Sequence, residues 1–348
     1  MKILFCFVTL LLTSQFAFSQ WVRQTVNTTS SFRGLAVVNE RVIWASGTGG
    51  TVIRTADGGA TWQIITIPGA EKLDFRDIEA FDAKTAYILS IGNGDSSRIY
   101  KTIDGGATWA LQFKNANEKA FFDAIACWDR INCIAMSDPV DGKFLLITTR
   151  NGGRNWNSRD TSKMPPAKDG EAAFAASGTC LITQGKTNVF LVTGGKDARV
   201  FRSVDRGQTW SVSDTDFVKG SSGSGIFSIA MLDAKVGMIV GGDYEKPAEH
   251  GENRRFTSDG GITWNRGGAI YGYRSGVAYV DRNKVIAVGS SGSDISMDSG
   301  NSWTNIDREN YNAVQARGPK AVWAVGAKGL VSKYNFEDPR RMIKMQPF

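Results

Sequence analysis

Apolar and β-branched residues in this chain form short runs bounded by Gly, Asp and Ser, a pattern typical of β strands. The runs TVIRT, SRIYKT, FLLITT, RVFRS, RRFTS and DISM each lead into a phrase of eight residues that recurs with small changes. A Trp ends the phrase, and another strand-like run such as WQIITI follows it. The pattern predicts a β hairpin whose turn is the phrase itself.

The phrase occurs as TADGGATW at 55, TIDGGATW at 102, TRNGGRNW at 149, SVDRGQTW at 203, TSDGGITW at 257 and SMDSGNSW at 296. Its third residue can accept hydrogen bonds from turn amides and from the first Ser or Thr, while Gly supplies a positive φ. We interpret this position as structural because a turn tolerates Asn where a catalytic carboxylate would not. The residues are Asp57, Asp104, Asn151, Asp205, Asp259 and Asp298.

Two further strand candidates precede each phrase, which gives units of four strands. The second candidates are VIWASG, TAYILSI, CIAMSD, VFLVTG, VGMIVGG and VIAVGS, and the first are FRGLAVV, FRDIEAF, FFDAIAC, EAAFAAS, GIFSIAM and YRSGVAY. The phrase Trp residues are 47, 47, 54, 54 and 39 residues apart. This period is that of a β-propeller blade.

A seventh unit, YNAVQAR, AVWAVGA and LVSKYN, has three strand candidates and no phrase after them. The run WVRQTV at 21–26 reads like the strand that follows the phrase, with Trp21 in the place of the phrase Trp. We therefore predict an all-β fold: a seven-bladed propeller over residues 20–337, with its ring closed by the N-terminal strand. Residues 338–348 would form a C-terminal tail.

The first residues have the features of a signal peptide: Lys2, the apolar stretch ILFCFVTLLL, and the small-residue site Ala17-Phe18-Ser19. Cleavage would remove residues 1–19, so we expect an exported protein, periplasmic or secreted, without a transmembrane segment. The remaining 40 basic and 34 acidic residues give a net charge of +6. These charges are interspersed and form no basic stripe with aromatic residues, so we expect no nucleic acid partner. We expect a monomer.

Three cysteines remain after export. Cys127 and Cys133 flank the short turn in CWDRINC, so a disulfide across a hairpin is open to them in an oxidising compartment. Cys180 is then left over, most simply as a small buried hydrophobic residue.

The propeller pattern divides the chain between two faces. The phrase lies on one face, and the starts of first strands and the ends of second strands lie on the opposite face. The opposite face carries the candidate site for a ligand or partner, because arginine forks suit carboxylate or phosphate groups and carboxylates stand between them. The candidates are Arg33, Arg76, Asp77, Asp123, Asp138, Glu171, Asp243, Tyr244 and Arg274.

Other chemistry finds little support in the sequence. The single histidine, His250, lies in the long polar loop DYEKPAEHGENRR, and no nucleophile elbow is present. Metal sites built on His and Cys clusters are not expected. The Gly-rich stretches at 46 and 220 are not followed by a helix, so we expect no dinucleotide and no other cofactor.

The phrase resembles the Asp-box, or BNR repeat, of sialidases and many secreted propellers. The mature chain resembles the BNR propellers of the photosystem II assembly-factor type, in the stretches SDPVDGKFLLITT, GEAAFAASGTC, SGIFSIA, VGGDYEKP and YRSGVAYV. Bacterial relatives of that type often carry the labels oxidoreductase or glycosyl hydrolase. The resemblance implies a chaperone-like binder with an arginine-bearing face, in which Arg33, Arg76 and Arg274 hold the partner.

Two functions remain open from the sequence. The favoured one is an exported scaffold that binds a protein, a peptide or an anionic glycan through the charged face. The alternative is a glycan-active hydrolase or lyase of sialidase-like architecture. Its acid and base would come from Asp77, Asp123, Asp138, Glu171 and Asp243, with no catalytic residue assigned among them. The chain lacks a Phe-Arg-Ile-Pro segment near its start, which departs from the sialidase pattern.

Overall fold

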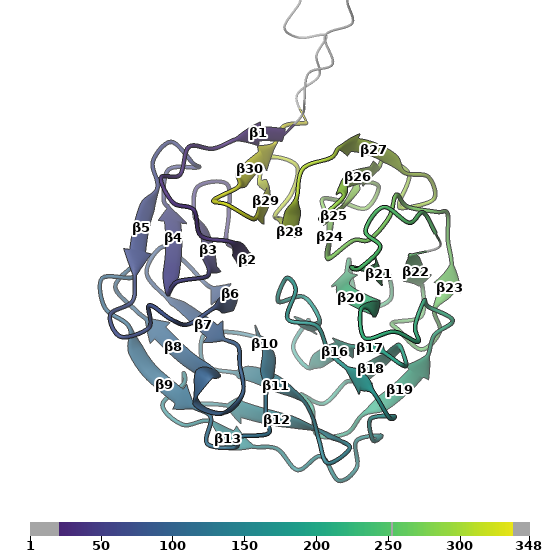
Figure 1. Ribbon diagram of the computed structural model, residues 1–348, viewed down its shortest axis with the longest axis horizontal. Helices are drawn as coiled ribbons and strands as arrows, with labels where there is room; N and C mark the ends of the chain where they lie inside the picture. Colours follow the sequence, from purple (N-terminus) through teal and green to yellow (C-terminus); the bar gives the residue numbers. More distant parts are fainter. Residues whose placement is uncertain (1–20, 252, 337–348) are drawn as a thin grey trace, which may run out of the picture.

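The structure is a computed structural model that describes residues 21–251 and 253–336. The predicted signal peptide (1–19) and the tail (338–348) lie outside the described residues. Within the described part, the strands form seven antiparallel sheets that stand around a central axis like blades (Figure 1). The prediction of an all-β, seven-bladed propeller is therefore confirmed. No helix in this described part has the length and apolar character needed to cross a membrane.

Each blade runs from an inner first strand to an outer fourth strand. Blade 1 is β2 (Phe32–Val37), β3 (Ile43–Gly47), β4 (Thr51–Thr55) and β5 (Gln63–Thr66). Blade 2 is β6 (Phe75–Ala80), β7 (Ala86–Ser90), β8 (Arg98–Thr102) and β9 (Ala110–Lys114), with the 3-10 turn η1 (Gly94–Ser96) before β8. Blade 3 is β10 (Phe122–Cys127), β11 (Cys133–Val140), β12 (Lys143–Thr149) and β13 (Asn157–Ser158).

The remaining blades follow the same order. Blade 4 is β15 (Leu181–Gln184), β16 (Asn188–Val192), β18 (Arg199–Ser203) and β19 (Ser211–Asp214). Blade 5 is β20 (Ser224–Met231), β21 (Gly237–Asp243), β22 (Arg254–Thr257) and β23 (Asn265–Arg266). Blade 6 is β24 (Gly276–Tyr279), β25 (Val285–Gly289), β26 (Gly292–Ser296) and β27 (Thr304–Asp307). Blade 7 is β28 (Tyr311–Ala316), β29 (Val322–Gly326), β30 (Val331–Tyr334) and the N-terminal β1 (Trp21–Arg23).

Blade 4 departs from the prediction. The run EAAFAAS at 171–177 was expected as its first strand, but the first strand is β15. Residues 171–172 instead form β14 (Glu171–Ala172), which pairs with β17 (Gly194–Gly195), and β17 pairs with β20 of blade 5. The run is rich in Ala and has no β-branched residue, so its strand propensity is low. The chain from 173 to 180, named the central loop below, therefore leaves the sheet.

The N-terminal strand closes the ring as predicted. β1 pairs antiparallel with β30, with Trp21 opposite Tyr334 and Val22 opposite Lys333. Val22 pairs with Lys333 in the third strand of blade 7 as Gln63 pairs with Arg54 in the third strand of blade 1. Trp21 therefore occupies the position of Trp62 in the first phrase. The Trp21 indole packs edge-on against Tyr334 and donates a hydrogen bond to Ser293 Oγ in blade 6, 2.9 Å away.

The repeated phrase is a closed hydrogen-bonded turn. In the fourth copy, Asp205 Oδ1 accepts from Ser203 Oγ at 2.8 Å and from the amide of Thr209 at 2.9 Å, and Oδ2 accepts from Thr209 Oγ1 at 2.6 Å. The amide of Gly207 donates to Ser203 Oγ. In the third copy Asn151 Oδ1 still accepts from Thr149 Oγ1 and the amide of Asn155. An acceptor oxygen at this position is therefore more important to the turn than a negative charge.

The phrase Trp also joins neighbouring blades. Trp109 packs edge-on against Trp44 in the second strand of blade 1, with ring centroids 6.4 Å apart. Trp156 meets Tyr87 in blade 2 in the same way, and Trp62 meets Trp323 in blade 7. These hairpins thus pack their Trp against the preceding blade, which gives a structural reason for the recurrence of the phrase in six of the seven blades.

We expect Asp205→Ala to lower the free energy of unfolding by about 1–2 kcal/mol, because several turn hydrogen bonds lose their acceptor. Asp205→Asn keeps an acceptor oxygen, as Asn151 does, and should cost less than half as much. Urea unfolding of both variants measures this difference. Equal losses for Ala and Asn would contradict the account of the turn.

Candidate functional site

A β-bulge recurs near the start of the inner strand in blades 1, 2, 3, 5 and 7. The register between first and second strands shifts across one residue in each of these blades, and a bulge re-aims the residue it contains. These bulged residues are Arg33, Arg76, Asp123, Phe227 and Asn312. All of them line one pocket at the axis, named the mouth pocket below.

The mouth pocket has a volume of about 540 Å³ and lies on the face opposite the phrase turns. Its other walls come from the residues before first strands, such as Ser31, and from turns between second and third strands, such as Ser290 and Ala327. The size falls within the range of about 300–1,000 Å³ that is usual for ligand sites. The pocket therefore has the position and size of a binding site.

The central loop forms the floor of this pocket. In Figure 1 a teal loop reaches from the β16 side toward the axis, between β10 and β20. Ser177 Oγ donates to the carbonyl of Ser275 at 2.7 Å, and the Thr179 carbonyl accepts from the amide of Ile229. Residues 173–176 line the mouth pocket and residues 177–179 line a second pocket on the other side. The loop therefore divides the central channel into two pockets.

Two arginines hold the loop from above. Arg33 Nη1 donates to the carbonyl of Ala176 at 3.1 Å, and Arg76 Nη1 donates to that of Ala175 at 3.3 Å. Arg76 also pairs with Asp74 at 2.7 Å, and the two side chains are 30% and 25% exposed. Burial, and then the nearby Arg76, lower the pKa of Arg33. Two cations thus stand close together at the mouth, a setting that favours a bound anion.

An aromatic cluster forms another wall of the mouth pocket. Phe174 of the central loop stacks on Phe227, with ring centroids 3.8 Å apart. Tyr273 and Tyr244 meet Phe227 edge-on at 4.7 and 6.2 Å. Tyr244 is 47% exposed, so the cluster offers an accessible ring beside the arginines. An apolar side chain and an anionic group could therefore bind side by side.

Two carboxylates complete the mouth. Asp138 Oδ1 accepts from the amide of Ala173 at 2.8 Å, while Asp123 is buried and its Oδ2 has no hydrogen-bond partner among the described residues. Burial raises the pKa of Asp138 to about 6. Burial, and then the neighbouring Asp138, raise the pKa of Asp123 well above its usual range. Both shifts favour the uncharged carboxyl, so burial weakens the negative charge that this pair sets beside the arginines.

Asp77 lies beneath the central loop. Its Oδ1 accepts from the amide of Ile78 at 2.8 Å and its Oδ2 from the amide of Ile125 at 2.7 Å, so it joins blades 2 and 3. Burial raises its pKa to about 7. Gly178 packs on this carboxylate at a φ of 76°, where a Cβ would lie 2.2 Å from Asp77 Oδ1. Asp77 therefore faces the loop and does not line the mouth pocket.

Arg274 does not join the other two arginines, so the expected convergence of three arginines is wrong. Its side chain is fully buried in blade 6, where Nε pairs with Asp294 Oδ2 at 2.8 Å. The register explains the difference. Gly276 pairs with Val288 as Gly34 pairs with Ser46, so Ser275 matches Arg33 and Arg274 matches the core residue Phe32. The similarity of YRSG to FRG misaligned the repeat by one residue.

Glu171 and Asp243 also lie outside the mouth pocket. Glu171 does not begin a first strand as predicted; it is buried in β14 and pairs with Arg199, and it accepts a hydrogen bond from Thr193 Oγ1. Asp243 accepts hydrogen bonds from the amide of Glu245 and from Ser221 Oγ, and it lines a separate pocket. Both carboxylates stabilise local structure at these places.

The described structure also places the cysteines. Cys127 and Cys133 form a disulfide between β10 and β11, with their Cα atoms 4.0 Å apart. Cys180 is a buried free thiol at the end of the central loop, and burial, then Asp123, raise its pKa. Among the described residues, no cluster of three or more His, Cys, Asp or Glu side chains has the arrangement of a metal site.

Sequence reasoning missed Phe174, Phe227, Tyr273 and Asn312. Phe227 and Asn312 occupy the bulge position near the start of the first strand, which also carries Arg33 and Arg76, and this repeated position is the signal for them. The role of Phe174 depends on the central loop, which the strand prediction over 171–177 concealed.

Solved structures share this fold at low sequence identity. YCF48 from Cyanidioschyzon merolae matches with a TM-score of 0.68 and 17% identity, over 91% of this chain and 99% of that chain. A structure described as YCF48 bound to D1 peptide matches with a TM-score of 0.64 and 15% identity, over 92% and 96%. The expected resemblance to the photosystem II assembly-factor type of propeller is thus confirmed at the level of the fold.

A glycoside hydrolase also shares the fold. The GH74 enzyme of Niastella koreensis matches with a TM-score of 0.62 and 14% identity, over 92% of this chain and 54% of that chain. No protein-family model matches the chain, and no curated protein sequence matches it.

The raised pKa of Asp138 predicts a specific pH dependence. A carboxyl whose pKa is raised on folding contributes stability below its unfolded pKa of about 3.9, and loses that contribution as pH rises through about 6. Asp138→Asn keeps the acceptor for Ala173 without the charge. We therefore expect the wild type to lose about 1–3 kcal/mol relative to Asp138→Asn between about pH 4.5 and pH 7.5.

Denaturant unfolding of both proteins at the two pH values measures this change. If the difference in unfolding free energy between the two proteins is the same at both pH values, the pKa of Asp138 is not raised on folding.

Proposed function

We propose that this protein is a binding scaffold that holds an extended polypeptide segment in the mouth pocket. The observation that carries the proposal is the placement of Arg33 and Arg76 beside the aromatic cluster of Phe174, Phe227, Tyr244 and Tyr273, above a floor made of backbone. Such a pocket suits a peptide with an acidic group and an apolar or aromatic side chain.

The chemistry of the two arginines supports an anionic ligand group. The structure gives Arg33 one hydrogen bond, to Ala176, although a guanidinium has five N–H donors. Burial raises the pKa of Asp123 and the pKa of Asp138, which favours the uncharged forms of both carboxyls. Arginine N–H donors would therefore be available to a ligand carboxylate, and repulsion from the Asp123–Asp138 pair would be weakened. The likeness in fold to a propeller described as bound to a D1 peptide agrees with a peptide ligand.

The place where the scaffold acts is part of the proposal. The residues 1–19 have the composition of a signal peptide, and the Cys127–Cys133 disulfide suits an oxidising compartment. We propose that the protein acts as a monomer in the periplasm or outside the cell. A polypeptide partner would then be another exported or membrane protein.

Arginine variants test the site directly. We expect the mature chain to bind acidic peptides that contain aromatic residues more tightly than basic or purely polar peptides of the same length. Arg33→Ala and Arg76→Ala should each weaken this binding about ten- to a hundredfold, the effect of one lost charge-assisted hydrogen bond. Added salt should reduce the difference. Fluorescence anisotropy with labelled peptides measures the affinities.

Arg150→Ala is the matched control, because Arg150 is exposed in the third phrase on the opposite face. Equal affinity for all peptides, or equal losses in Arg150→Ala and Arg33→Ala, would contradict a peptide site at the mouth.

A glycan-active hydrolase remains the second candidate because Asp123 and Asp138 form a buried acid pair in the same pocket. One protonated and one ionised carboxyl is the arrangement that glycoside hydrolysis requires. In that case Asp123→Asn should abolish turnover of an acidic oligosaccharide while binding persists. Without turnover by the wild type, this candidate fails while the peptide site stands.

A further inference from the structure

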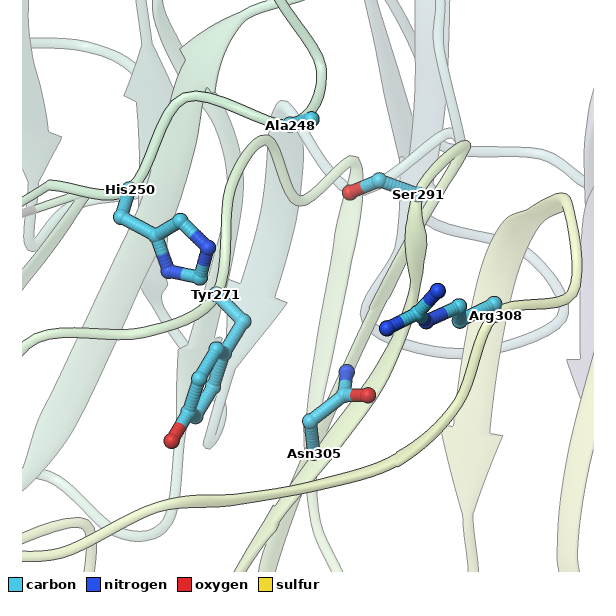
Figure 2. A pocket seen from close by; sticks show the side chains of 6 residues that line it. All are labelled: Ala248, His250, Tyr271, Ser291, Asn305 and Arg308. Atoms are coloured by element: carbon cyan, nitrogen blue, oxygen red, sulfur yellow. The ribbon is translucent and has the colours of Figure 1, made fainter.

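A pocket distinct from those described above lies between the long loop after β21 and blade 6, and is named the rim pocket. It has a volume of about 450 Å³ and is lined by Ala248, His250, Tyr271, Ser291, Asn305 and Arg308. Figure 2 shows the rings of His250 and Tyr271 on one side, with Ser291, Asn305 and Arg308 on the other side. None of these residues lines the mouth pocket.

The rim pocket is built on a buried ion pair. Arg274 and Asp294 both have 0% side-chain exposure. Arg274 Nη1 donates to Ser291 Oγ at 2.9 Å. Asp294 Oδ1 accepts from Asn305 Nδ2 at 3.0 Å, and Asp294 Oδ2 accepts from the amide of Tyr271 at 3.1 Å. The pair therefore fixes the lining residues on both sides of the pocket.

The position of this pair in the repeat shows that the fold does not require it. Arg274 matches Phe32, and Asp294, opposite Ala287, matches Ile53, opposite Ala45. Blade 1 thus fills the two positions with apolar side chains in one core cluster, and blade 2 fills them with Phe75 and Tyr100. Burying an ion pair gives no stability advantage over such an apolar pair. Blade 6 therefore keeps a costly pair that orders the rim pocket.

The lining chemistry indicates the ligand. Tyr271 is 43% exposed, and its ring meets His250 edge-on at 5.1 Å, so aromatic surface is available for the C–H groups of a sugar ring. The Asn305 amide nitrogen donates to the Ser293 carbonyl and to Asp294 Oδ1, so the amide oxygen of Asn305 is available to a sugar hydroxyl. Arg308 is exposed, and its guanidinium is directed across the pocket in Figure 2. Among the described lining residues it is the one full charge, and no carboxylate accompanies it.

We propose that the rim pocket binds an acidic sugar unit of the uronic acid type, with its carboxylate on Arg308 and its ring against Tyr271. Ser291 and Asn305 hydrogen-bond its hydroxyls. Arg274 and Asp294 are positioning residues that act through Ser291, Asn305 and Tyr271. The site is independent of the mouth pocket and of the peptide that we propose for it.

Isothermal titration of the mature chain with an oligomer of galacturonic acid, and with the neutral galactose oligomer of the same length, tests the site. We expect the acidic oligomer to bind at least about tenfold more tightly than the neutral one. Arg308→Ala and Tyr271→Ala should each weaken the acidic oligomer about ten- to a hundredfold. Both are surface changes that leave the buried pair intact. Arg33→Ala and Arg150→Ala should leave the affinity unchanged.

A double variant tests the positioning role of Arg274 and Asp294. The double change Arg274→Phe with Asp294→Ile restores the apolar pair of blade 1, so it should keep or raise the melting temperature while it removes binding of the acidic oligomer.

Specific outcomes would overturn the proposal. The proposal fails if the acidic oligomer does not bind, or if the neutral oligomer binds equally well. It also fails if Arg33→Ala loses affinity for the acidic oligomer while Arg308→Ala does not, because the saccharide would then bind at the mouth. Full binding by a folded Arg274→Phe, Asp294→Ile variant would overturn the positioning role.

Discussion

The pairing of β1 with β30 is the constraint on which the ring depends. Each blade buries its apolar faces against two neighbours, and a ring of blades leaves no blade without a neighbour only when the last blade is complete. The chain completes blade 7 with its N-terminal strand, so the two ends of the fold hold each other. The phrase turns then secure each hairpin to the preceding blade through Trp residues such as Trp109 on Trp44.

The function we propose depends on the one blade that departs from this regular pattern. In blade 4 the inner strand begins only at Leu181, which frees the central loop to cross the channel. Arg33, Arg76 and Asp138 hold this loop through its backbone. A channel open at both ends becomes a pocket with a floor, and the floor brings Phe174 to the aromatic cluster. The groups that shape the mouth are therefore the same groups that would contact a ligand.

The blade period and the closing strand could be predicted from the sequence because turn chemistry and strand alternation are local signals. The mouth could be predicted only in part. Arg33, Arg76 and Asp123 follow from a repeated position, whereas Arg274 was misplaced by one residue because Tyr273-Arg274 imitates Phe32-Arg33. A shift of one residue exchanges core and channel positions. The central loop could not be predicted, since contacts from distant blades hold an Ala-rich run outside the sheet.

The most direct measurement is amide hydrogen exchange of the mature chain with and without a bound acidic aromatic peptide. Our account predicts added protection in residues 173–176 and 310–312, which border the mouth pocket. The phrase turns on the opposite face should exchange at unchanged rates. Protection confined to the phrase turns or to the outer strands, with none in the central loop, would contradict the claim that the mouth pocket holds the polypeptide.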